Sequence, residues 1–423
     1  MTIFAKTFTF VEKCCKLDES LQLMIADVVY VRKGQVIKMK IALGMIISSL
    51  DTEDEIMRFI DNAEKYGHKL NCVIVAYTKR FNAQAASNIN NKVPLHAVNI
   101  NNPKHAYDEF HRLDISETAT QTLLSCPVDT GAGLVPYGFN RTIVTIEAIL
   151  RGIDILFFVD NDVFPTVLTE TEEGITENEV DFFGEHLKQL KAGSTITTGE
   201  YSGYNILPPA AFDCMDDLLF GVQKNDMLDY WKTSFAHRCM TVQATDRTPV
   251  SCSKILGGNT ALTLSAFSSL PTFFSSYYYV DDELYLNRGE DTVLGIGIAN
   301  SGTVCTDIKL FPLHDTYKSY PSEPDLCNDA AAQIRFFYAC TGWIGRNPFL
   351  NYINGNDLQS VRDSQRHRLE RGVDALARYT SNPRFLSIMR NFDISWENVG
   401  RYINEYEQVL EAWDEFTGRS DIK

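Results

Sequence analysis

The chain has 423 residues, of which 44% are apolar and 22% are charged, and its formal net charge at pH 7 is −16. This length exceeds that of most single domains, so we expect one large catalytic domain with a smaller appendage. The negative charge argues against a nucleic-acid partner and against electrostatic docking on an anionic membrane.

Targeting and redox signals are few. No apolar run approaches the ~18–20 residues of a membrane-spanning helix, and the N-terminal stretch lacks the pattern of a signal peptide. The ten cysteines form no CxxC pair, which argues against a zinc ribbon or a thioredoxin motif. Free thiols in a reducing cytoplasm are therefore the simplest interpretation, and we expect a cytoplasmic protein with no transmembrane segment.

The first part of the chain predicts a parallel sheet. Residues 1–39 are mixed in character and form an N-terminal extension, with a short hairpin turning at Lys33-Gly34. A buried strand at 41–47, a capped helix at 52–67 and a second buried strand at 70–76 make a βαβ unit. Residues 94–100 are a possible third strand. Strand, helix and strand at this spacing place the strands parallel to one another.

The next unit ends in two carboxylates. A helix from Tyr137 to Gly152 leads into the apolar run 155–159, which continues directly into Asp160-Asn161-Asp162. An unbroken apolar run suits a strand buried on both faces, and ligands bind outside the carboxyl ends of such strands. Two hard oxygen donors at that place suit Mg²⁺ or Mn²⁺. The alternative is an Asp-Asn-Asp surface turn, which is a common structure.

Three further signals follow along the chain. Residues 180–190 predict an amphipathic helix, 194–199 a strand and 201–254 a loop-rich stretch. Gly257-Gly258-Asn259 beside a β-favouring run allows a close backbone approach to a ligand. Glu290-Asp291 opens a predicted helix, and His314 ends an apolar segment. From about residue 325 the pattern is wholly helical, so we expect a catalytic domain at 40–324 and a helical region at 325–423.

The order of these motifs resembles one family. Asp160-Asn161-Asp162, then Gly257-Gly258, then Glu290-Asp291 and finally His314 resemble the nucleotide-sugar glycosyltransferases of the GT-A type, in the style of family 2 and of the polypeptide N-acetylgalactosaminyltransferases. The resemblance covers about residues 40–320. It implies a Rossmann-like α/β fold with a mostly parallel sheet flanked by helices, a UDP- or GDP-linked sugar donor, and a hydroxyl acceptor that is a carbohydrate or a small polyol.

The resemblance also implies roles for individual residues. Asp160, Asp162 and His314 correspond to metal ligands, with a nitrogen ligand favouring Mn²⁺ over Mg²⁺. Asp291 corresponds to a general base that would give an inverting reaction, and Glu290 would orient the acceptor or the metal. Donor contacts are expected from a larger set of positions. These are Ser48, Asp51, Tyr77, Arg141, Asp160, Gly257, Gly258 and Asn259.

Each assignment has a plainer alternative. His314 also fits a surface histidine or a histidine that contacts the metal ligands without binding the metal. Arg141 also fits an arginine in an ordinary salt bridge. Glu290 and Asp291 are also stabilised simply by lying at a helix N-terminus. The arginines at 362, 366, 368 and 371 suit either an anion site or a solvated helix face. The C-terminal helices cover the acceptor side or mediate a homo-oligomer.

Two other functions compete with the transferase. An apolar strand followed by Asp160-Asn161-Asp162-Val163 also fits a haloacid-dehalogenase-type phosphatase with Asp160 as the nucleophile. That family places the motif near its N-terminus, whereas here 159 residues precede Asp160. The remaining alternative is an inactive GT-A domain that only binds nucleotide-sugars.

Overall fold

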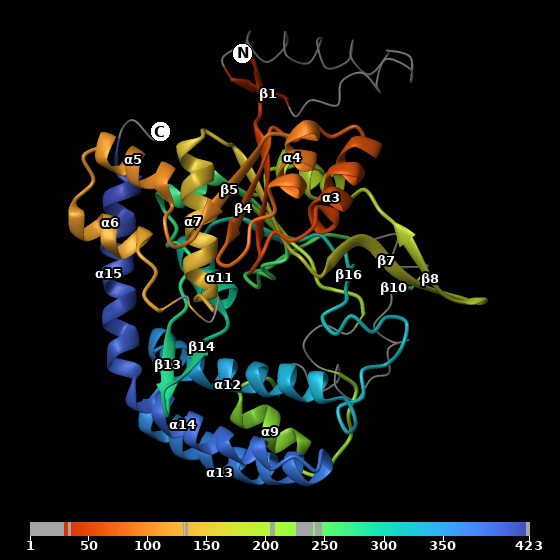
Figure 1. Ribbon diagram of the computed structural model, residues 1–423, viewed down its shortest axis with the longest axis vertical. Coiled ribbons are helices and arrows are strands. Elements are labelled where there is room, and N and C mark those ends of the chain that lie inside the picture. Colours follow the sequence, from red (N-terminus) through yellow and green to blue (C-terminus); the bar gives the residue numbers. More distant parts are fainter. Residues whose placement is uncertain are drawn as a thin grey trace, which may run out of the picture.

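A computed structural model describes residues 29–32, 35–129, 131, 134–203, 208–225, 240–241 and 248–419 (Figure 1). A large sheet lies at the centre with helices on both faces, and a group of helices forms the opposite end of the molecule from strand β1. The predicted N-terminal extension lies mainly outside the described residues. Its hairpin pairs β1 (Val29–Arg32) antiparallel with β2 (Gln35–Lys38), and the predicted turn residues lie outside the described chain.

The described part of the main sheet has eight strands, of which the four nearest one edge are parallel. From one edge to the other, the eight strands are β11 (Val250–Ser251), β15 (Cys305–Asp307), β9 (Ile196–Thr198), β12 (Asn259–Thr263), β6 (Ile155–Asp160), β3 (Ile41–Ile46), β4 (Cys72–Tyr77) and β5 (Leu95–Asn99). The last four of these are the parallel ones. β12 is antiparallel to both of its neighbours, whereas β9 and β15 are parallel to each other. Most of the sheet is thus parallel, as the βαβ pattern predicts.

Alternating strand residues divide the interior into two cores. Ala42, Ile74 and Phe158 face α5, α6 and α7, whereas Leu43 and Phe157 face α3 and α8. Both sets are apolar because each strand is buried on both faces, which explains the unbroken apolar runs in the sequence. The covering helices are α3 (Asp54–Lys65), α4 (Ala83–Lys92), α5 (Lys104–Arg112), α6 (Glu117–Leu124), α7 (Tyr137–Leu150), α8 (Phe182–Lys191) and α11 (Glu290–Ser301).

A second, smaller sheet begins directly after β6, at the turn that follows Asp160. β7 (Val163–Thr171) pairs antiparallel with β8 (Gly174–Glu179) and with β16 (Pro312–His314), and parallel with β10 (Met240–Thr241). The β7–β8 hairpin extends away from the main sheet (Figure 1). A separate hairpin, β13 (Tyr277–Val280) with β14 (Glu283–Leu286), packs toward the helical end.

The C-terminal helices form a third core. This core joins α12 (Ala330–Ile353), α13 (Leu358–Tyr379), η6 (Pro383–Ser387) and α14 (Ile388–Glu397) to α9 (Met215–Gly221) and to the β13–β14 hairpin. The last helix, α15 (Val399–Thr417), runs back along the molecule to α6 (Figure 1). Its Trp413 and Phe416 are buried in the same core as α5 and α7. Each region thus packs elements from the other into its core, and the domain boundary at 325 stays a prediction.

The predicted fold class is confirmed: the protein is α/β, with a mostly parallel sheet flanked by helices and a helical C-terminal region. The predicted elements at 41–47, 52–67, 70–76, 94–100, 137–152 and 194–199 all correspond to observed ones. None of the described helices is long and apolar enough to cross a bilayer. The seven described cysteines are free thiols, and the Sγ atoms of Cys252 and Cys305 lie 3.6 Å apart without a disulfide.

Candidate functional site at the carboxyl edge of the sheet

The parallel strands bring the first group of predicted residues to one edge. Ile46 at the end of β3 pairs with Asp160 at the end of β6 on one side and with Ala76 of β4 on the other. Ser48 and Tyr77 therefore follow strands that end beside the strand carrying Asp160. Because parallel strands share their carboxyl edge, these residues, which are distant in sequence, lie along the same edge of the sheet.

The predicted base and ribose region forms a polar, partly exposed surface. Ser48 is exposed, and its carbonyl accepts a hydrogen bond of 2.8 Å from the backbone of Lys79. Asp51 accepts two hydrogen bonds from Arg80, and these lower the pKa of the Asp51 carboxyl. The ring of Tyr77 packs 5.3 Å from that of Phe81, which is 45% exposed. A nucleoside needs an aromatic face on which its base can stack and a group that accepts a hydrogen bond from a ribose hydroxyl. The rings of Tyr77 and Phe81 and the carboxylate of Asp51 suit these two needs.

The second group meets through strand pairing between distant segments. His314 pairs with Val163 across β16 and β7, which places its side chain beside the Asp160–Asp162 turn. Nε2 of His314 lies 3.0 Å from Oδ1 of Asp162. The His314 ring also packs on Tyr201, with centroids 4.5 Å apart. The antiparallel pairing of β16 with β7 is thus the feature that carries His314 to Asp162.

The electrostatics of this corner favour an ionised Asp162. Burial by itself raises the pKa of Asp162, but the charge and hydrogen bond of His314 and the charge of Arg335 hold it well below its usual range. Burial likewise opposes the charged form of His314, yet the nearby Asp162 carboxylate raises its pKa. Arg335 of α12 donates to Oδ2 of Asp162 at 3.0 Å from a side chain that is 45% exposed. His314 and Arg335 thus stabilise the carboxylate form of Asp162.

The donor set fits a divalent cation. Asp160, Asp162 and His314 each offer a ligand atom, and these atoms all lie within 4.8 Å of one another. Ligand atoms of one ion with bonds of ~2.1 Å lie at most about 4.2 Å apart, which is close to the separation of these three groups. Two carboxylates and one imidazole suit Mn²⁺ or Mg²⁺, with the nitrogen favouring Mn²⁺. Arg335 is exposed enough to leave Asp162 when a metal binds.

Arg141 ties three of the motifs together. Its Nε donates to Oε1 of Glu290 at 3.0 Å, its Nη1 to the carbonyl of Gly257 at 2.8 Å, and its Nη2 to Oδ1 of Asp160 at 2.9 Å. The Arg141 side chain is only 6% exposed. Burial disfavours its charge, but Asp160 and Glu290 more than offset this and raise the pKa of Arg141. The sequence places Arg141 among donor contacts, whereas the structure shows it as an internal link.

Gly257 and Gly258 are needed because no side chain fits there. A Cβ at Gly257 would lie 2.4 Å from Nη2 of Arg141, and a Cβ at Gly258 would lie 2.5 Å from Oδ2 of Asp160. The backbone N–H of Gly258 also donates to the hydroxyl of Tyr201 at 2.9 Å. The two glycines therefore let the backbone lie against the side chains of Arg141 and Asp160, whereas the predicted approach to a ligand stays a prediction.

Glu290 and Asp291 lie at the first turn of α11 and differ in environment. Glu290 is buried against Arg141, and burial together with the neighbouring Asp291 raises its pKa. Asp291 is half-buried, and its Oδ1 accepts from the backbone N–H of Thr292 at 2.7 Å. No hydrogen bond from the described residues reaches its Oδ2. Of this pair, Asp291 is the more exposed carboxylate and the one without a salt bridge from the described residues.

Asn259 differs from the expectation. It is completely buried, and its amide bonds His186 at 3.0 Å and the carbonyls of Glu200 and Leu310 at 3.0 and 3.1 Å. A side chain with no exposed surface and with all these partners has nothing to offer a donor. Asn259 therefore holds β12 to its neighbours, and the prediction that it contacts the donor is not supported by its position.

Three residues of this corner are absent from the sequence-based prediction: Arg335, Tyr201 and Thr316. The hydroxyl of Thr316 lies 3.0 Å from Nε2 of His314. None of the three belongs to a motif, and only the fold brings them to Asp162 and His314. The arginines of α13 behave as a paired helix face instead of an anion site. Arg362 and Arg366 contact Asp393, whereas Arg368 and Arg371 contact Asp217.

Comparison with known proteins identifies no family. No protein-family model matches the sequence, and no curated protein matches it. Similar solved structures include one described as a mycobacterial protein, with 12% identity, coverage of 76% of this chain and 77% of that one, and a TM-score of 0.35. Another is glucosyl-3-phosphoglycerate synthase from Mycobacterium tuberculosis with phosphoglyceric acid, with 11% identity, coverage of 72% and 80%, and a TM-score of 0.33. Likeness at this level assigns neither a family nor an activity.

Proposed function

We propose that this protein is a metal-dependent glycosyltransferase that moves a hexose from a UDP- or GDP-linked donor to a hydroxyl acceptor. One observation carries the proposal: four motifs from separate parts of the chain meet at one corner. Asp162 contacts His314, and Arg141 connects Asp160, Gly257 and Glu290 by direct hydrogen bonds. An Asp-Asn-Asp surface turn would not require these distant partners.

The metal-binding residues are Asp160, Asp162 and His314, which would hold Mn²⁺ or Mg²⁺. A bound divalent cation neutralises the charge that develops on a nucleoside diphosphate leaving group. Arg141 is a positioning residue, because its bonds to Asp160 and Glu290 fix one metal ligand relative to the acceptor side. Ser48, Asp51 and Tyr77 are the proposed nucleoside contacts, at the ends of β3 and β4. Gly257 and Gly258 leave room for the side chains of Arg141 and Asp160, and we propose that the donor's phosphates lie beside this loop.

Asp291 is the proposed general base. Thr292 holds its Oδ1, which leaves Oδ2 to take the proton of the acceptor hydroxyl as the acceptor oxygen bonds to the anomeric carbon. The bond from that carbon to the diphosphate oxygen breaks with its electron pair leaving on the diphosphate. Attack opposite the leaving group inverts the anomeric configuration. Glu290, with its raised pKa, would orient the acceptor.

The first experiment measures donor binding by thermal shift. UDP, GDP and CDP, alone and as sugar conjugates, are screened with and without Mn²⁺ on the wild type and on Asp162→Asn. We expect one nucleotide to raise the melting temperature only with Mn²⁺, by mass action, and Asp162→Asn to abolish the rise. Asp374→Asn is the matched control, because Asp374 is an exposed residue of α13. A rise that persists in Asp162→Asn would contradict the proposed metal site.

The second experiment separates the base from the binding residues. Asp291→Asn should keep the Mn²⁺-dependent thermal shift and lower the rate of nucleoside diphosphate release from the identified donor by ~10²–10⁴-fold. Hydrolysis of p-nitrophenyl phosphate that depends on Asp160, without any nucleotide response, would instead indicate the phosphatase. Mn²⁺-dependent binding without release of diphosphate in any condition would indicate an inactive nucleotide-sugar-binding domain.

A further inference from the structure

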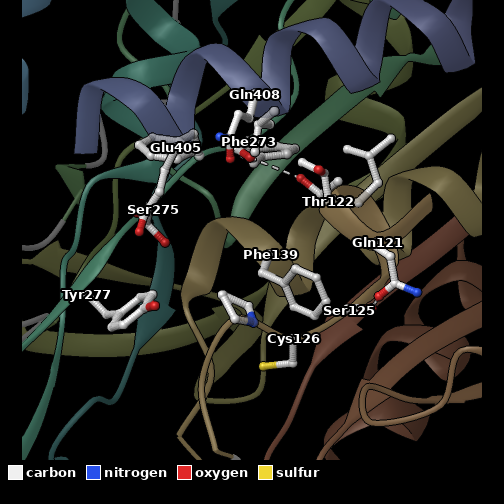
Figure 2. A pocket seen from close by; sticks show the side chains of 15 residues that line it. Gln121, Thr122, Ser125, Cys126, Phe139, Phe273, Ser275, Tyr277, Glu405 and Gln408 are labelled. Carbon is white, nitrogen blue, oxygen red and sulfur yellow. Dashed lines mark hydrogen bonds between the residues drawn. The ribbon is translucent and has the colours of Figure 1, made fainter. Parts of the chain in front are cut away.

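A cavity of about 390 Å³ lies outside the candidate site, between α6, α7 and α15. The cavity is lined by the end of α6 with residues 125–127, by α7 and by the segment 273–277, and α15 lies over its top (Figure 2). None of Asp160, Asp162, His314, Glu290 or Asp291 lines it. The cavity is therefore a separate feature, and its interpretation does not depend on the proposed function.

The lining is aromatic and electrically neutral. Phe139, Phe273, Phe274 and Tyr277 contribute rings, and the side chains of Phe139, Phe273 and Tyr277 are labelled in Figure 2. The only charged side chain in the lining is Glu405. Arg401 neutralises it through an ion pair, and the hydroxyl of Ser276 donates to its other oxygen. A charged ligand would therefore lose its hydration without gaining a free counter-charge.

The polar groups of the lining are largely used within the protein. The hydroxyl of Ser275 accepts from the backbone N–H of Gly138 at 2.7 Å, and that of Thr142 donates to the carbonyl of Phe273 at 3.0 Å. The hydroxyl of Ser125 bonds the side chain of Gln121 at 2.6 Å. Gln408, at the top of the cavity in Figure 2, is exposed. The interior thus favours apolar contacts, and hydrogen bonding is left to the rim.

The volume limits the size of the occupant. An apolar cavity of ~150 Å³ holds one benzene molecule. A space of about 390 Å³ is roughly two and a half times larger and lies within the range of small-molecule sites. The space therefore matches a compound of two or three rings, with faces to stack on the four aromatic side chains.

We propose that this cavity is a second binding site, for an uncharged, mostly apolar compound of two or three rings. The ligand stacks between Phe139 and Phe273 and presents any hydroxyl to the rim at Gln408. The site shares a wall with the metal corner, because the guanidinium of Arg141 lies 5.9 Å from the ring centre of Phe273. An occupant is thus one side chain away from the residue that links Asp160 to Glu290.

Two fluorescent probes test both the site and its charge preference. N-phenyl-1-naphthylamine is uncharged and has three aromatic rings, and 8-anilinonaphthalene-1-sulfonate has the same rings with an added sulfonate. We expect saturable binding of the neutral probe at one site per chain and at least tenfold weaker binding of the sulfonate at this site. Absence of saturable binding, or equal affinity for the two probes, would overturn the proposal.

A pair of variants on one helix locates the binding. Thr122→Phe places a ring in the cavity and should weaken binding of the neutral probe at least tenfold. Thr118→Phe makes the same change one turn earlier on α6, at an exposed residue that does not line the cavity, and should leave the affinity unchanged. If both variants bind the probe as the wild type does, the site lies elsewhere.

Cys126 provides an independent readout because its thiol lines the cavity and is half-buried. Bound probe should slow alkylation of Cys126 by N-ethylmaleimide, measured by peptide mass spectrometry. The exposed Cys214 lies in α9's N-cap and should react at the same rate with and without the probe. Saturable probe binding without protection of Cys126 would contradict the assignment.

Discussion

Two groups of arginine–carboxylate pairs contrast in this protein. At the candidate site Nη2 of Arg141 lies 2.9 Å from Asp160, and on α13 Nε of Arg366 lies 3.0 Å from Asp393. The distances are the same within error, but the Arg141 side chain is 6% exposed and that of Arg366 is 44% exposed. Both regions therefore contain an arginine–aspartate ion pair of similar length, and the two pairs differ in how far they are buried.

Burial gives the two groups different consequences. An exposed ion pair contributes about 0–1 kcal/mol, because water and salt screen it. Removing one partner of a buried pair leaves an uncompensated charge and costs ~3–5 kcal/mol. The Arg141 network thus fixes the relative positions of Asp160, Gly257 and Glu290, whereas the Arg366–Asp393 pair lies at the surface. A cluster of charges in a sequence carries little meaning until its solvent exposure is known.

We expect the largest effect on stability when the buried arginine is replaced, and the same replacement at the surface tests the contrast. Arg141→Met should lower the free energy of unfolding by ~3–5 kcal/mol, because Asp160 and Glu290 lose their shared cation in a buried place. Arg366→Met is the same substitution on the surface and should cost less than about 1 kcal/mol. Urea unfolding monitored by circular dichroism measures both. Equal losses in the two variants would show that burial is not the deciding factor.

A second prediction extends the contrast to a buried neutral group. His186 is fully buried, and burial lowers its pKa from 6.5 to about 4. Above pH 6.5 the folded and unfolded states are both neutral at this residue. As the pH falls from 6.5 to 4, only the unfolded state binds a proton, so stability falls by up to ~3 kcal/mol and then levels off.

The measurement compares unfolding free energies between pH 7.5 and pH 4.5. His186→Gln should show a shallower loss of stability over this range than the wild type, because the titrating group is gone. His111→Gln changes an exposed histidine and should follow the wild-type profile. If the slope of His186→Gln matches that of the wild type, another group causes the acid sensitivity.

We expect the smallest effect from replacing glycines, one at the candidate site and one at an exposed position of a helix. Gly258→Ala forces a Cβ to within 2.5 Å of Asp160 and 2.8 Å of the Tyr201 hydroxyl, so we expect a loss of ~1–3 kcal/mol from overpacking. The Mn²⁺-dependent donor response should weaken with it, because Asp160 must move. Gly400→Ala meets no atom within 4 Å and lies in the first turn of α15, where alanine should stabilise the helix by up to ~1 kcal/mol.

Opposite signs for the two glycine variants in thermal unfolding would support the close approach of the backbone to Asp160. A Gly258→Ala variant with wild-type stability and an unchanged nucleotide response would contradict it.

Local sequence pattern was a good guide where elements are strongly apolar. The strands at 41–46, 72–77 and 155–160 are buried on both faces, so their apolar runs are visible without any tertiary information. Other elements lack such a signal. Helix α5 buries only Ala106 and Phe110 among its nine residues, and β8 is mostly exposed. A segment that packs few side chains carries too weak a pattern to be recognised.

The sequence by itself determined that two carboxylates follow a buried strand, that two glycines precede another, and that a carboxylate pair opens a helix. Each of these is a local property of a few consecutive residues. Only the tertiary structure decided that His314 pairs beside Asp162, that Arg141 joins three motifs, that Asn259 is sealed inside the sheet and that four aromatic rings enclose a cavity. Many of these depend on contacts between segments far apart in the chain, for example the 152-residue separation of Asp162 and His314 and the 116-residue separation of Arg141 and Gly257. Such contacts follow from how the whole chain packs, and no local pattern encodes them.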